Sequence, residues 1–343
     1  MPDLRALIRL ETSLLYAMAV FLFPATVQAA ERLNLDNPIV LQRADPWIHQ
    51  VKDSGCYYFI GTAPEFDRIE LRHACRLNDL KLAEPAVIWR MKDSGPMSAN
   101  IWAPELHRID GTWYIYFAAG DAAKRFSIRM YVLSNPNDDP TTGTWKEEGQ
   151  ITTHLDSFSL DATTFEHRDK RYLVWAQMDQ DRNYNSALLM AEMDSPVSIS
   201  PPVIVLSEPD LEWERQGYKV NEGAAVIVRN GRVFVTYSAS ATDDRYAMGL
   251  LWADEDDDLM DPSNWNKIPE PVFGTDPDLG RYGPGHNSFV LAEDGETDLM
   301  IYHSRDYREL KGTPLTDPNR HARARILFWG ENGFPDFHPQ DGD

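Results

Sequence analysis

Three carboxylates stand at the beginning of apolar, strand-like runs, where an ionised side chain is costly to bury. Asp45 lies in ADPWI, Asp161 in SLDATTF and Glu222 in VNEGAAV. A buried carboxylate is tolerated when it is paired or used in chemistry. Glycosidic bond cleavage uses such a set, because one acid protonates the leaving oxygen while a second acts as base or nucleophile. A third carboxylate nearby raises the pKa of the acid and orients it.

Two other roles remain open for these acids. Clustered carboxylates also bind hard cations such as Ca²⁺, but the close D-x-D spacing of a loop site is missing around them. Each acid alone could instead bond the backbone of a neighbouring strand. Because the three acids recur at what we interpret as one register, a common catalytic site is the favoured interpretation.

Five repeated hairpin units must position these acids. Each unit has a leading polar residue, an apolar strand, a turn containing Asp, Asn or Gly, and an aromatic-rich strand. Further strand-like runs such as SIRMYVLS and SALLMAEM follow the hairpins, and helical periodicity is scarce after residue 31. This pattern predicts an all-β fold, a five-bladed β-propeller with four strands per blade whose first strands line one axis. The leading polar residues are Asp45, Glu105, Asp161, Glu222 and Asn287, separated by 60, 56, 61 and 65 residues.

Glu105 is the exception among these leading residues. It lies in WAPEL, where the neighbouring proline shifts the phase of the strand. We therefore expect Glu105 to be structural. Trp102, three residues earlier, could stack on a sugar face or pack between blades.

Composition and charge narrow the class of protein. The 343 residues are 43% apolar and 11% aromatic, which excludes a disordered chain, and the formal net charge is −21. Such a charge repels nucleic acid and anionic membranes and favours neutral or cationic partners. We expect a monomer with no nucleic-acid partner.

The first residues have the pattern of an export signal. Two arginines precede the apolar run 14–23, and Ala29 and Ala30 offer a cleavage site. We expect a signal peptide at 1–30, a single propeller domain at 31–343 and a secreted or periplasmic protein free of the membrane after cleavage. An uncleaved anchor is the alternative.

The chain has two cysteines, Cys56 and Cys75, which lie 19 residues apart. In an oxidising compartment they could form a disulfide if neighbouring strands bring them together. Two buried thiols are an equal alternative, because the sequence does not give the Cα separation that a disulfide requires.

Taken in order, the three acid motifs resemble glycoside hydrolase family 43 over about residues 35 to 338. The stretches PEFDRIELR and NIWAPELHRIDGTWYIYFAAG resemble the branch of exo-acting α-L-arabinofuranosidases that trim 1,5-linked arabinan. The resemblance implies an inverting enzyme that releases L-arabinose from the non-reducing end of plant cell-wall arabinan or arabino-oligosaccharides. It implies that Asp45 is the general base, Glu222 the general acid, and Asp161 the group that tunes and orients the acid.

The resemblance also implies roles for residues outside the three acids. His286, in GPGHNSF, would stand beside a structural calcium ion at the propeller axis. Calcium prefers oxygen ligands, so a histidine held by hydrogen bonds is the competing interpretation. Arg305, in YHSRDY, would reach the sugar hydroxyls, or else form a surface ion pair with Asp306. No organic cofactor is expected.

Other functions remain open at this stage. Within the family, β-xylosidase and endo-arabinanase activities differ through loops that set pocket depth. A non-catalytic sugar-binding propeller would need aromatic platforms but not three registered acids. The related retaining fructan-acting group carries NDP, RDP and EC motifs, whereas this chain has ADP, SLD and NEG.

Overall fold

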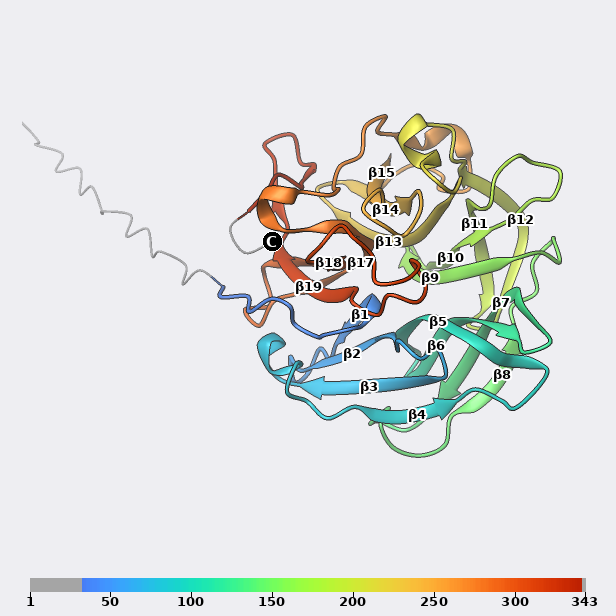
Figure 1. The fold of residues 1–343 in the computed structure, drawn as a ribbon. Helices are drawn as coiled ribbons and strands as arrows, with labels where there is room; N and C mark the ends of the chain where they lie inside the picture. The colour runs from blue at the N-terminus through green and yellow to red at the C-terminus, as the bar shows by residue number, and fades with distance from the viewer. Residues whose placement is uncertain (1–32, 341–343) are drawn as a thin grey trace, which may run out of the picture. The chain divides into compact units, whose positions relative to one another are not determined.

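The computed structural model describes residues 33–340, and the predicted signal peptide at 1–30 lies outside the described residues. From Leu35 onward the chain forms one compact unit of successive antiparallel sheets arranged around an axis (Figure 1). The predicted five-bladed β-propeller is confirmed. Among the described residues, no helix is long and apolar enough to span a membrane.

The first three blades are four-stranded sheets in which each strand pairs with the next along the chain. Blade one has β1 (Ala44–Gln50), β2 (Tyr57–Thr62), β3 (Arg68–Ala74) and β4 (Ala86–Arg90). Blade two has β5 (Pro96–Ile109), β6 (Thr112–Asp121), β7 (Lys124–Asn135) and β8 (Lys146–Gln150). Blade three has β9 (Ser159–His167), β10 (Lys170–Gln177), β11 (Ala187–Ser195) and β12 (Ser198–Ser207).

The last two blades are shorter at their outer edges, and 3₁₀ turns connect several strands. Blade four has β13 (Asn221–Arg229), β14 (Arg232–Ala239), β15 (Ala247–Asp254) and β16 (Asn266–Lys267). Blade five has β17 (Tyr282–Leu291), β18 (Asp298–Arg305) and β19 (His321–Ile326), and a small hairpin of β20 (Phe328–Trp329) and β21 (Pro335–Asp336) follows. The 3₁₀ turns are η1 (Leu77–Asp79), η2 (Glu212–Arg215), η3 (Pro262–Asn264) and η4 (Pro277–Leu279).

Turn chemistry sets the hairpins that begin the blades. Asp110 and Gly111 join β5 to β6, and Asn230 and Gly231 join β13 to β14. All four have positive φ, at 48°, 80°, 54° and 76°. Two consecutive residues of this kind form a type I′ turn, whose twist matches that of the paired strands. The sequence prediction of hairpins at these turns is therefore confirmed.

The ring of blades is closed by the segment that precedes β1. Ile39 donates its N–H to the Ala322 carbonyl at 2.9 Å, and the Ala322 N–H donates to the Val40 carbonyl at 2.9 Å. The Asn37 amide donates to the Ala324 carbonyl and accepts from the Ala324 N–H, both at 2.8 Å. This segment therefore takes the outer position in blade five, which has three named strands of its own rather than the predicted four.

The innermost strand of every blade bulges at an equivalent place, and β5 and β17 bulge at further places as well. The pairing register shifts there, and the first bulged residue has left-handed backbone. A bulge of this kind re-aims side chains beside a site. The equivalent bulged residues are Asp45 (φ 54°), Ala103 (43°), Asp161 (56°), Gly223 (57°) and His286 (43°).

These bulges correct the predicted register of the acids. Asp45 and Asp161 occupy the same bulge position as predicted, but Glu222 lies one residue before it and Glu105 two residues after it. His286, rather than Asn287, is the equivalent residue of blade five. The error arises because each bulge inserts a residue that a strict two-residue alternation does not count.

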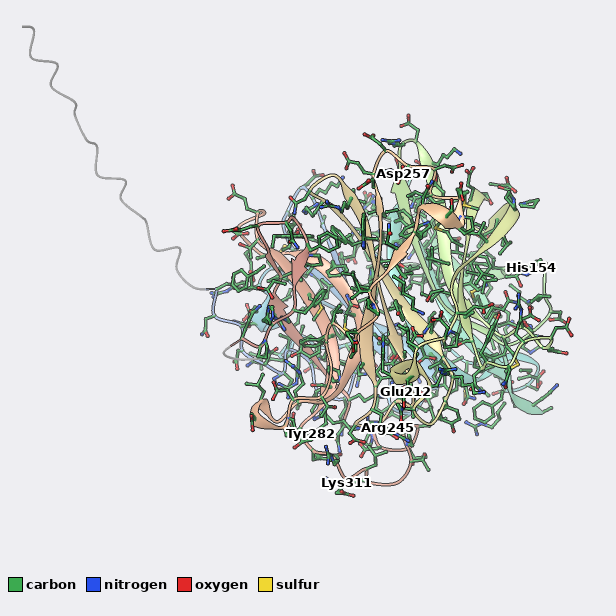
Figure 2. All side chains as sticks on the ribbon, turned by 90° about the horizontal axis from the view of Figure 1, so that it is seen from above. His154, Glu212, Arg245, Asp257, Tyr282 and Lys311 are labelled. Atoms are coloured by element: carbon green, nitrogen blue, oxygen red, sulfur yellow. A yellow bond between two sulfur atoms is a disulfide. The ribbon has the colours of Figure 1, made fainter. Side chains whose placement is uncertain are left out.

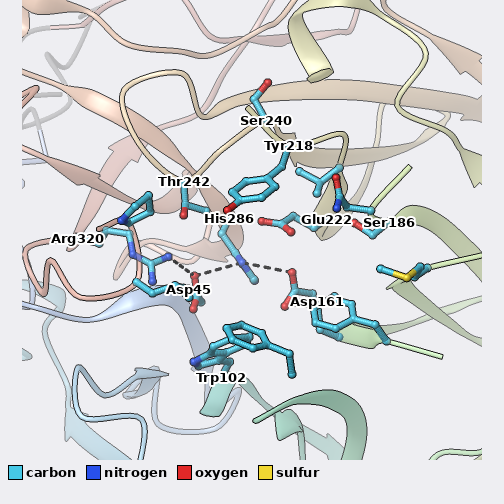
Figure 3. A pocket seen from close by; sticks show the side chains of 18 of the residues that line it. Asp45, Trp102, Asp161, Ser186, Tyr218, Glu222, Ser240, Thr242, His286 and Arg320 are labelled. Atoms are coloured by element: carbon cyan, nitrogen blue, oxygen red, sulfur yellow. Dashed lines mark hydrogen bonds and ion pairs between the residues drawn. The ribbon is translucent and has the colours of Figure 1, made fainter. Parts of the chain in front are cut away.

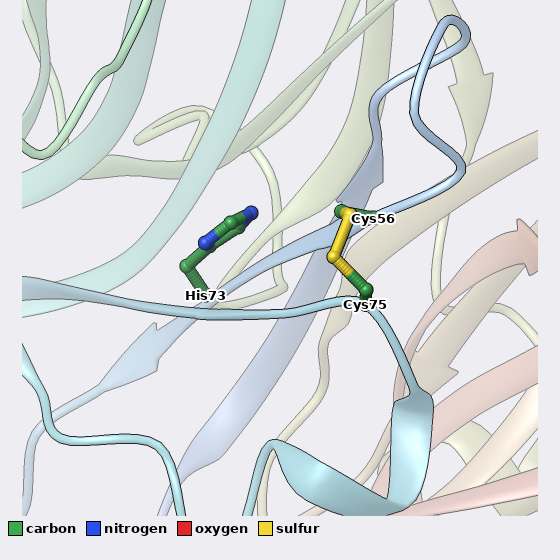
Figure 4. Close-up of side chains that lie close together, drawn as sticks. All are labelled: Cys56, His73 and Cys75. Atoms are coloured by element: carbon green, nitrogen blue, oxygen red, sulfur yellow. A yellow bond between two sulfur atoms is a disulfide. The ribbon is translucent and has the colours of Figure 1, made fainter.

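Cys56, immediately before β2, and Cys75, immediately after β3, are joined by a disulfide, which settles the alternative that the sequence left open (Figure 4). His73 lies beside it and stacks on Tyr58 at a ring-centroid distance of 4.6 Å. The acidic stretch 254–258 begins at the last residue of β15, and Asp257 lies in the turn that follows this strand (Figure 2).

We predict that Asn37→Ala lowers the free energy of unfolding by about 1 to 3 kcal/mol, because Ala324 loses both partners at the ring closure. Chemical denaturation monitored by tryptophan fluorescence measures the change. Lys81→Ala is the control, since it removes only the exposed ion pair with Asp36 in the same segment and should cost less than about 1 kcal/mol. Equal effects of the two variants would contradict a closing role for Asn37.

Candidate active site

The inner strands converge on a pocket of about 660 Å³ at one mouth of the axis (Figure 3). A cavity of this size suits a small ligand. Five of the residues singled out in the sequence line it together: Asp45, Trp102, Asp161, Glu222 and His286. They come from all five blades, so residues far apart in the chain meet as the propeller pattern predicts.

Asp45 is an ionised carboxylate held by a dense set of partners. Its Oδ2 accepts a hydrogen bond from the Thr62 hydroxyl at 2.6 Å, and its Oδ1 lies 3.3 Å from both Arg320 Nη1 and His286 Nδ1. Burial alone would raise the pKa of Asp45, but Arg320 first, then His286 and His303, together with Thr62, lower it to about 2. Asp45 can therefore accept a proton across the whole physiological pH range.

Glu222 and Asp161 have the opposite electrostatics. Burial first, and then the charge of Asp45, raise the pKa of Glu222 to about 7. The hydrogen bond that Tyr246 donates at 2.9 Å opposes this rise. Burial, Glu222 and Asp45 likewise raise the pKa of Asp161, although its Oδ2 accepts the Gly223 N–H at 3.1 Å. The two acids titrate as a pair that keeps a proton near neutral pH.

His286 stands between two of the carboxylates. Its Nδ1 lies 3.3 Å from Asp45 Oδ1 and 3.8 Å from Asp161 Oδ2, and its backbone N–H donates to the Ser238 hydroxyl at 2.8 Å. Burial lowers its pKa, although Asp45 opposes this. In the neutral ring, a proton on Nδ1 would point toward these carboxylates, so the ring can set their mutual position.

The fit of these residues to an axial calcium ion is poor. Ca²⁺ takes six to eight oxygen ligands. Within residues 33–340, the one group of three His, Cys, Asp or Glu ligands close enough to share an ion is Cys56, His73 and Cys75, and its two cysteines are already joined in the disulfide. The calcium ion implied by the family resemblance therefore stays a prediction, and no chemical step is assigned to it.

Arg305 does not line the pocket. It is 1% exposed and lies behind the wall, where Nη1 donates to the Thr242 carbonyl at 2.9 Å and Nη2 to the Pro314 carbonyl at 3.1 Å. Because Thr242 and Pro314 both line the cavity, Arg305 ties two of its walls together. Its predicted contact with sugar hydroxyls does not match this placement, and its alternative ion pair with Asp306 is taken by Arg323. The arginine on the cavity is Arg320.

Trp102 lines the cavity with its ring held by aromatic neighbours. Phe66 meets it edge-on at a centroid distance of 5.8 Å, and Phe126 lies at 6.2 Å. Phe126 is 62% exposed at the mouth, so an apolar rim continues outward from Trp102. This placement suits a sugar-stacking platform, which stays a prediction.

Glu105 is buried outside the cavity lining. Its Oε2 lies 3.0 Å from His107 Nε2, and burial raises its pKa well above the ordinary value while it lowers that of His107. A neutral carboxylic acid beside a neutral imidazole is a satisfied structural pair. This matches the structural role expected from the sequence.

Sequence reasoning missed three residues of the site: Tyr246, His303 and Arg320. Tyr246 stands immediately before β15 and His303 stands on β18, outside the innermost strands that carry the repeated polar residues. Arg320, in PNRHARARI, is one of three arginines within six residues, and no local pattern distinguishes it from the others. Finding His303 and Arg320 requires the register of β18 and β19, and finding Tyr246 requires the packing of the residue before β15.

Comparisons with known proteins give consistent matches. The family model for Glycosyl hydrolases family 43 matches residues 35–335. An extracellular exo-alpha-(1->5)-L-arabinofuranosidase of Streptomyces chartreusis is 51% identical over 299 residues, which cover 87% of this chain and 91% of that protein. Alpha-L-arabinofuranosidase 43 of Humicola insolens is 50% identical over 94% of this chain, which spans 66% of the length of that relative.

A solved structure is also similar to this chain. The crystal structure of an alpha-L-arabinofuranosidase from Lactobacillus brevis has a TM-score of 0.85 and 49% sequence identity, and it covers 88% of this chain and 95% of that chain.

We predict that Arg320→Gln destabilises the protein by about 1 to 3 kcal/mol at pH 7, because Asp45 loses its nearest cation. The pKa of Asp45 is depressed from 3.8 to about 2 in the folded state, so its stabilising effect is present above pH 4 and is lost as the pH falls toward 2. Since the variant has a smaller depression, the difference in Tm between the two proteins should shrink below pH 4. Arg129→Gln, whose partner Asp156 is exposed, is the control. A difference that is independent of pH would contradict the assigned pairing.

Proposed function

The chain belongs to glycosyl hydrolases family 43, and on this premise we propose that it is an exo-acting α-L-arabinofuranosidase that releases L-arabinose from the non-reducing end of α-1,5-linked arabinan and arabino-oligosaccharides. One observation carries the proposal. A small pocket holds an ionised carboxylate, Asp45, together with a carboxylic acid that keeps its proton near neutral pH, Glu222. This is the division of charge that inverting hydrolysis requires.

The reaction follows from these protonation states. Asp45 removes a proton from a water molecule, and the water oxygen bonds to the anomeric carbon from the face opposite the leaving group. The bond from that carbon to the leaving oxygen breaks with its electron pair on the oxygen, and Glu222 donates its proton there. The anomeric configuration inverts. Asp161, whose own pKa is raised by burial and by Glu222, accepts the Gly223 N–H, and we assign it the role of supporting the acid without touching the leaving oxygen.

The walls of the pocket support release of a terminal sugar. Thr313, Pro314 and Leu315, from the segment between β18 and β19, close one side, and Tyr218 and Phe126 stand at the mouth. Arg305 fixes that segment through the Pro314 carbonyl. An endo-acting enzyme needs a groove through which a chain can pass, and the segment 313–315 beside the acids supports the exo assignment.

We also propose an oligomeric state and a location for the enzyme. We propose that the active form is a monomer. The Streptomyces chartreusis relative is named extracellular, and we propose that this protein is exported too. Mass spectrometry of protein from the producing cell should find a mature N-terminus near Ala30 or Glu31. An intact Met1 on protein retained inside the cell would contradict export.

We predict different defects for the two reacting acids. Glu222→Gln should lower kcat/KM on arabinotriose by about 10²- to 10⁴-fold and lower it much less on an aryl arabinofuranoside, whose leaving group needs little protonation. Asp45→Asn should fail on both substrates, because each needs the activated water. The basic limb of the wild-type kcat/KM profile should lie near pH 7, where Glu222 loses its proton.

The control is Asp257→Asn, which removes a carboxylate from the surface loop and should change neither substrate. Early in the digestion of arabinotriose, chromatography should show arabinose and arabinobiose in equal amounts. Small and equal losses for Asp45→Asn and Glu222→Gln, with sugar binding retained, would make the propeller a binding module.

A further inference from the structure

Tyr246 is a buried phenol that points at the reacting acid. It is 1% exposed and stands immediately before β15, and its hydroxyl lies 2.9 Å from Glu222 Oε1, to which it donates. Glu222 belongs to the same blade, on β13. A buried hydroxyl that makes this bond loses much of its freedom to seek another partner.

The neighbouring blade fixes the aim of the Tyr246 ring. A Cβ atom at Gly285 would lie 2.5 Å from a ring carbon of Tyr246, so only glycine leaves room there. His303, the cross-strand partner of Gly285, stacks on the ring with a centroid distance of 5.8 Å and an interplanar angle of 6°. The ring is thus held between blades four and five, and a rotation of the phenol would bring it against Gly285 and His303 of blade five.

His303 connects this ring to the base. The backbone N–H of Asp45 donates to His303 Nδ1 at 3.1 Å, which requires that nitrogen to be unprotonated. The ring is 0% exposed, and burial first and then Arg320 keep its pKa well below the ordinary value. His303 is therefore neutral with its proton on Nε2, and it touches the base through the backbone and the tyrosine through its ring.

We propose that Tyr246 is a positioning residue that determines which oxygen of Glu222 carries the transferable proton. The phenol has one proton and donates it to Oε1, so Oε1 is occupied as an acceptor. The proton of neutral Glu222 then stands on Oε2, the oxygen left free for the leaving group. Once that proton has moved to the leaving oxygen, the Tyr246 bond stabilises the new carboxylate on Oε1. This inference rests on the proposed role of Glu222 as the general acid.

Without the hydroxyl, the proton of Glu222 would distribute over both oxygens, and the carboxylate formed on transfer would lose a partner. Other titratable or charged groups around Glu222 are Asp45, Asp161, His286 and Arg320, and the change leaves all of them in place. The Tyr246 bond lowers the pKa of Glu222, so its removal should raise that pKa. The signature is a weaker acid that keeps its proton to higher pH.

The test is Tyr246→Phe, which removes the hydroxyl and keeps the ring between Gly285 and His303. We expect kcat/KM on arabinotriose to fall about ten- to hundredfold, the range for a lost hydrogen bond to a group that becomes charged. On an aryl arabinofuranoside with a good leaving group the loss should be several times smaller. The basic limb of the pH profile should move to higher pH.

Tyr237→Phe is the matched control. Tyr237 is also buried in blade four, and its hydroxyl donates to a carboxylate, Glu214 Oε1, at 2.7 Å, but it does not line the pocket. Tyr237→Phe should lower Tm but leave unchanged the pH profile and the ratio of the kcat/KM values on the two substrates. If Tyr246→Phe behaves like Tyr237→Phe, or loses activity equally on both substrates with an unmoved basic limb, the inference is overturned.

Glu222→Gln, measured beside these variants, separates this inference from the proposed function. If Glu222→Gln discriminates strongly between the two substrates and Tyr246→Phe does not, Glu222 remains the acid and the role of Tyr246 is wrong. If Glu222→Gln does not discriminate either, the assignment of the acid itself is wrong, and the inference falls with it.

Discussion

Three carboxylates share one guanidinium in this pocket, and the chemistry of the site depends on that shortage of positive charge. Among the described lining residues, Arg320 is the one Lys or Arg, and its Nη1 lies 3.3 Å from Asp45. One cation can compensate one buried anion. Asp45 is therefore ionised, and Asp161 and Glu222, left with each other, keep a proton. Position relative to Arg320, more than residue type, separates base from acid.

The fold delivers this arrangement through a feature repeated in every blade. The inner strand bulges at the mouth of the axis, and its left-handed residue turns a side chain toward the centre. Asp45, Asp161 and His286 use that position directly. Arg320 comes instead from the residue immediately before β19. Strand β19 pairs at Ala322 with Val40, in the segment before β1 that closes the ring. The residues that close the propeller therefore lie beside Arg320, the cation that keeps Asp45 ionised.

Much of this was predictable because the repeat is local. Hairpin turns such as Asp110-Gly111 and the spacing of the units indicate five blades, and strands that begin blades must meet at the axis. The exact register was not predictable, since a bulge adds a residue without any required residue type, as Asp45, Ala103 and Gly223 at equivalent positions illustrate. Arg305 was misplaced for a related reason: the direction of a side chain near the end of β18 depends on packing against Thr242 and Pro314, which the sequence does not reveal.

The displaced register of Glu222 has a physical reason in its neighbours. The bulge position in blade four is Gly223, where a Cβ atom would lie 2.9 Å from the His286 ring, so a carboxylate cannot stand there while His286 stands between Asp45 and Asp161. The acid instead takes the preceding residue, within reach of Tyr246, and the Gly223 N–H is left to bond Asp161. One glycine thereby admits the imidazole beside the base and bonds the carboxylate beside the acid. The base Asp45 and the acid Glu222 accordingly reach the pocket from different positions on their strands and have different neighbours.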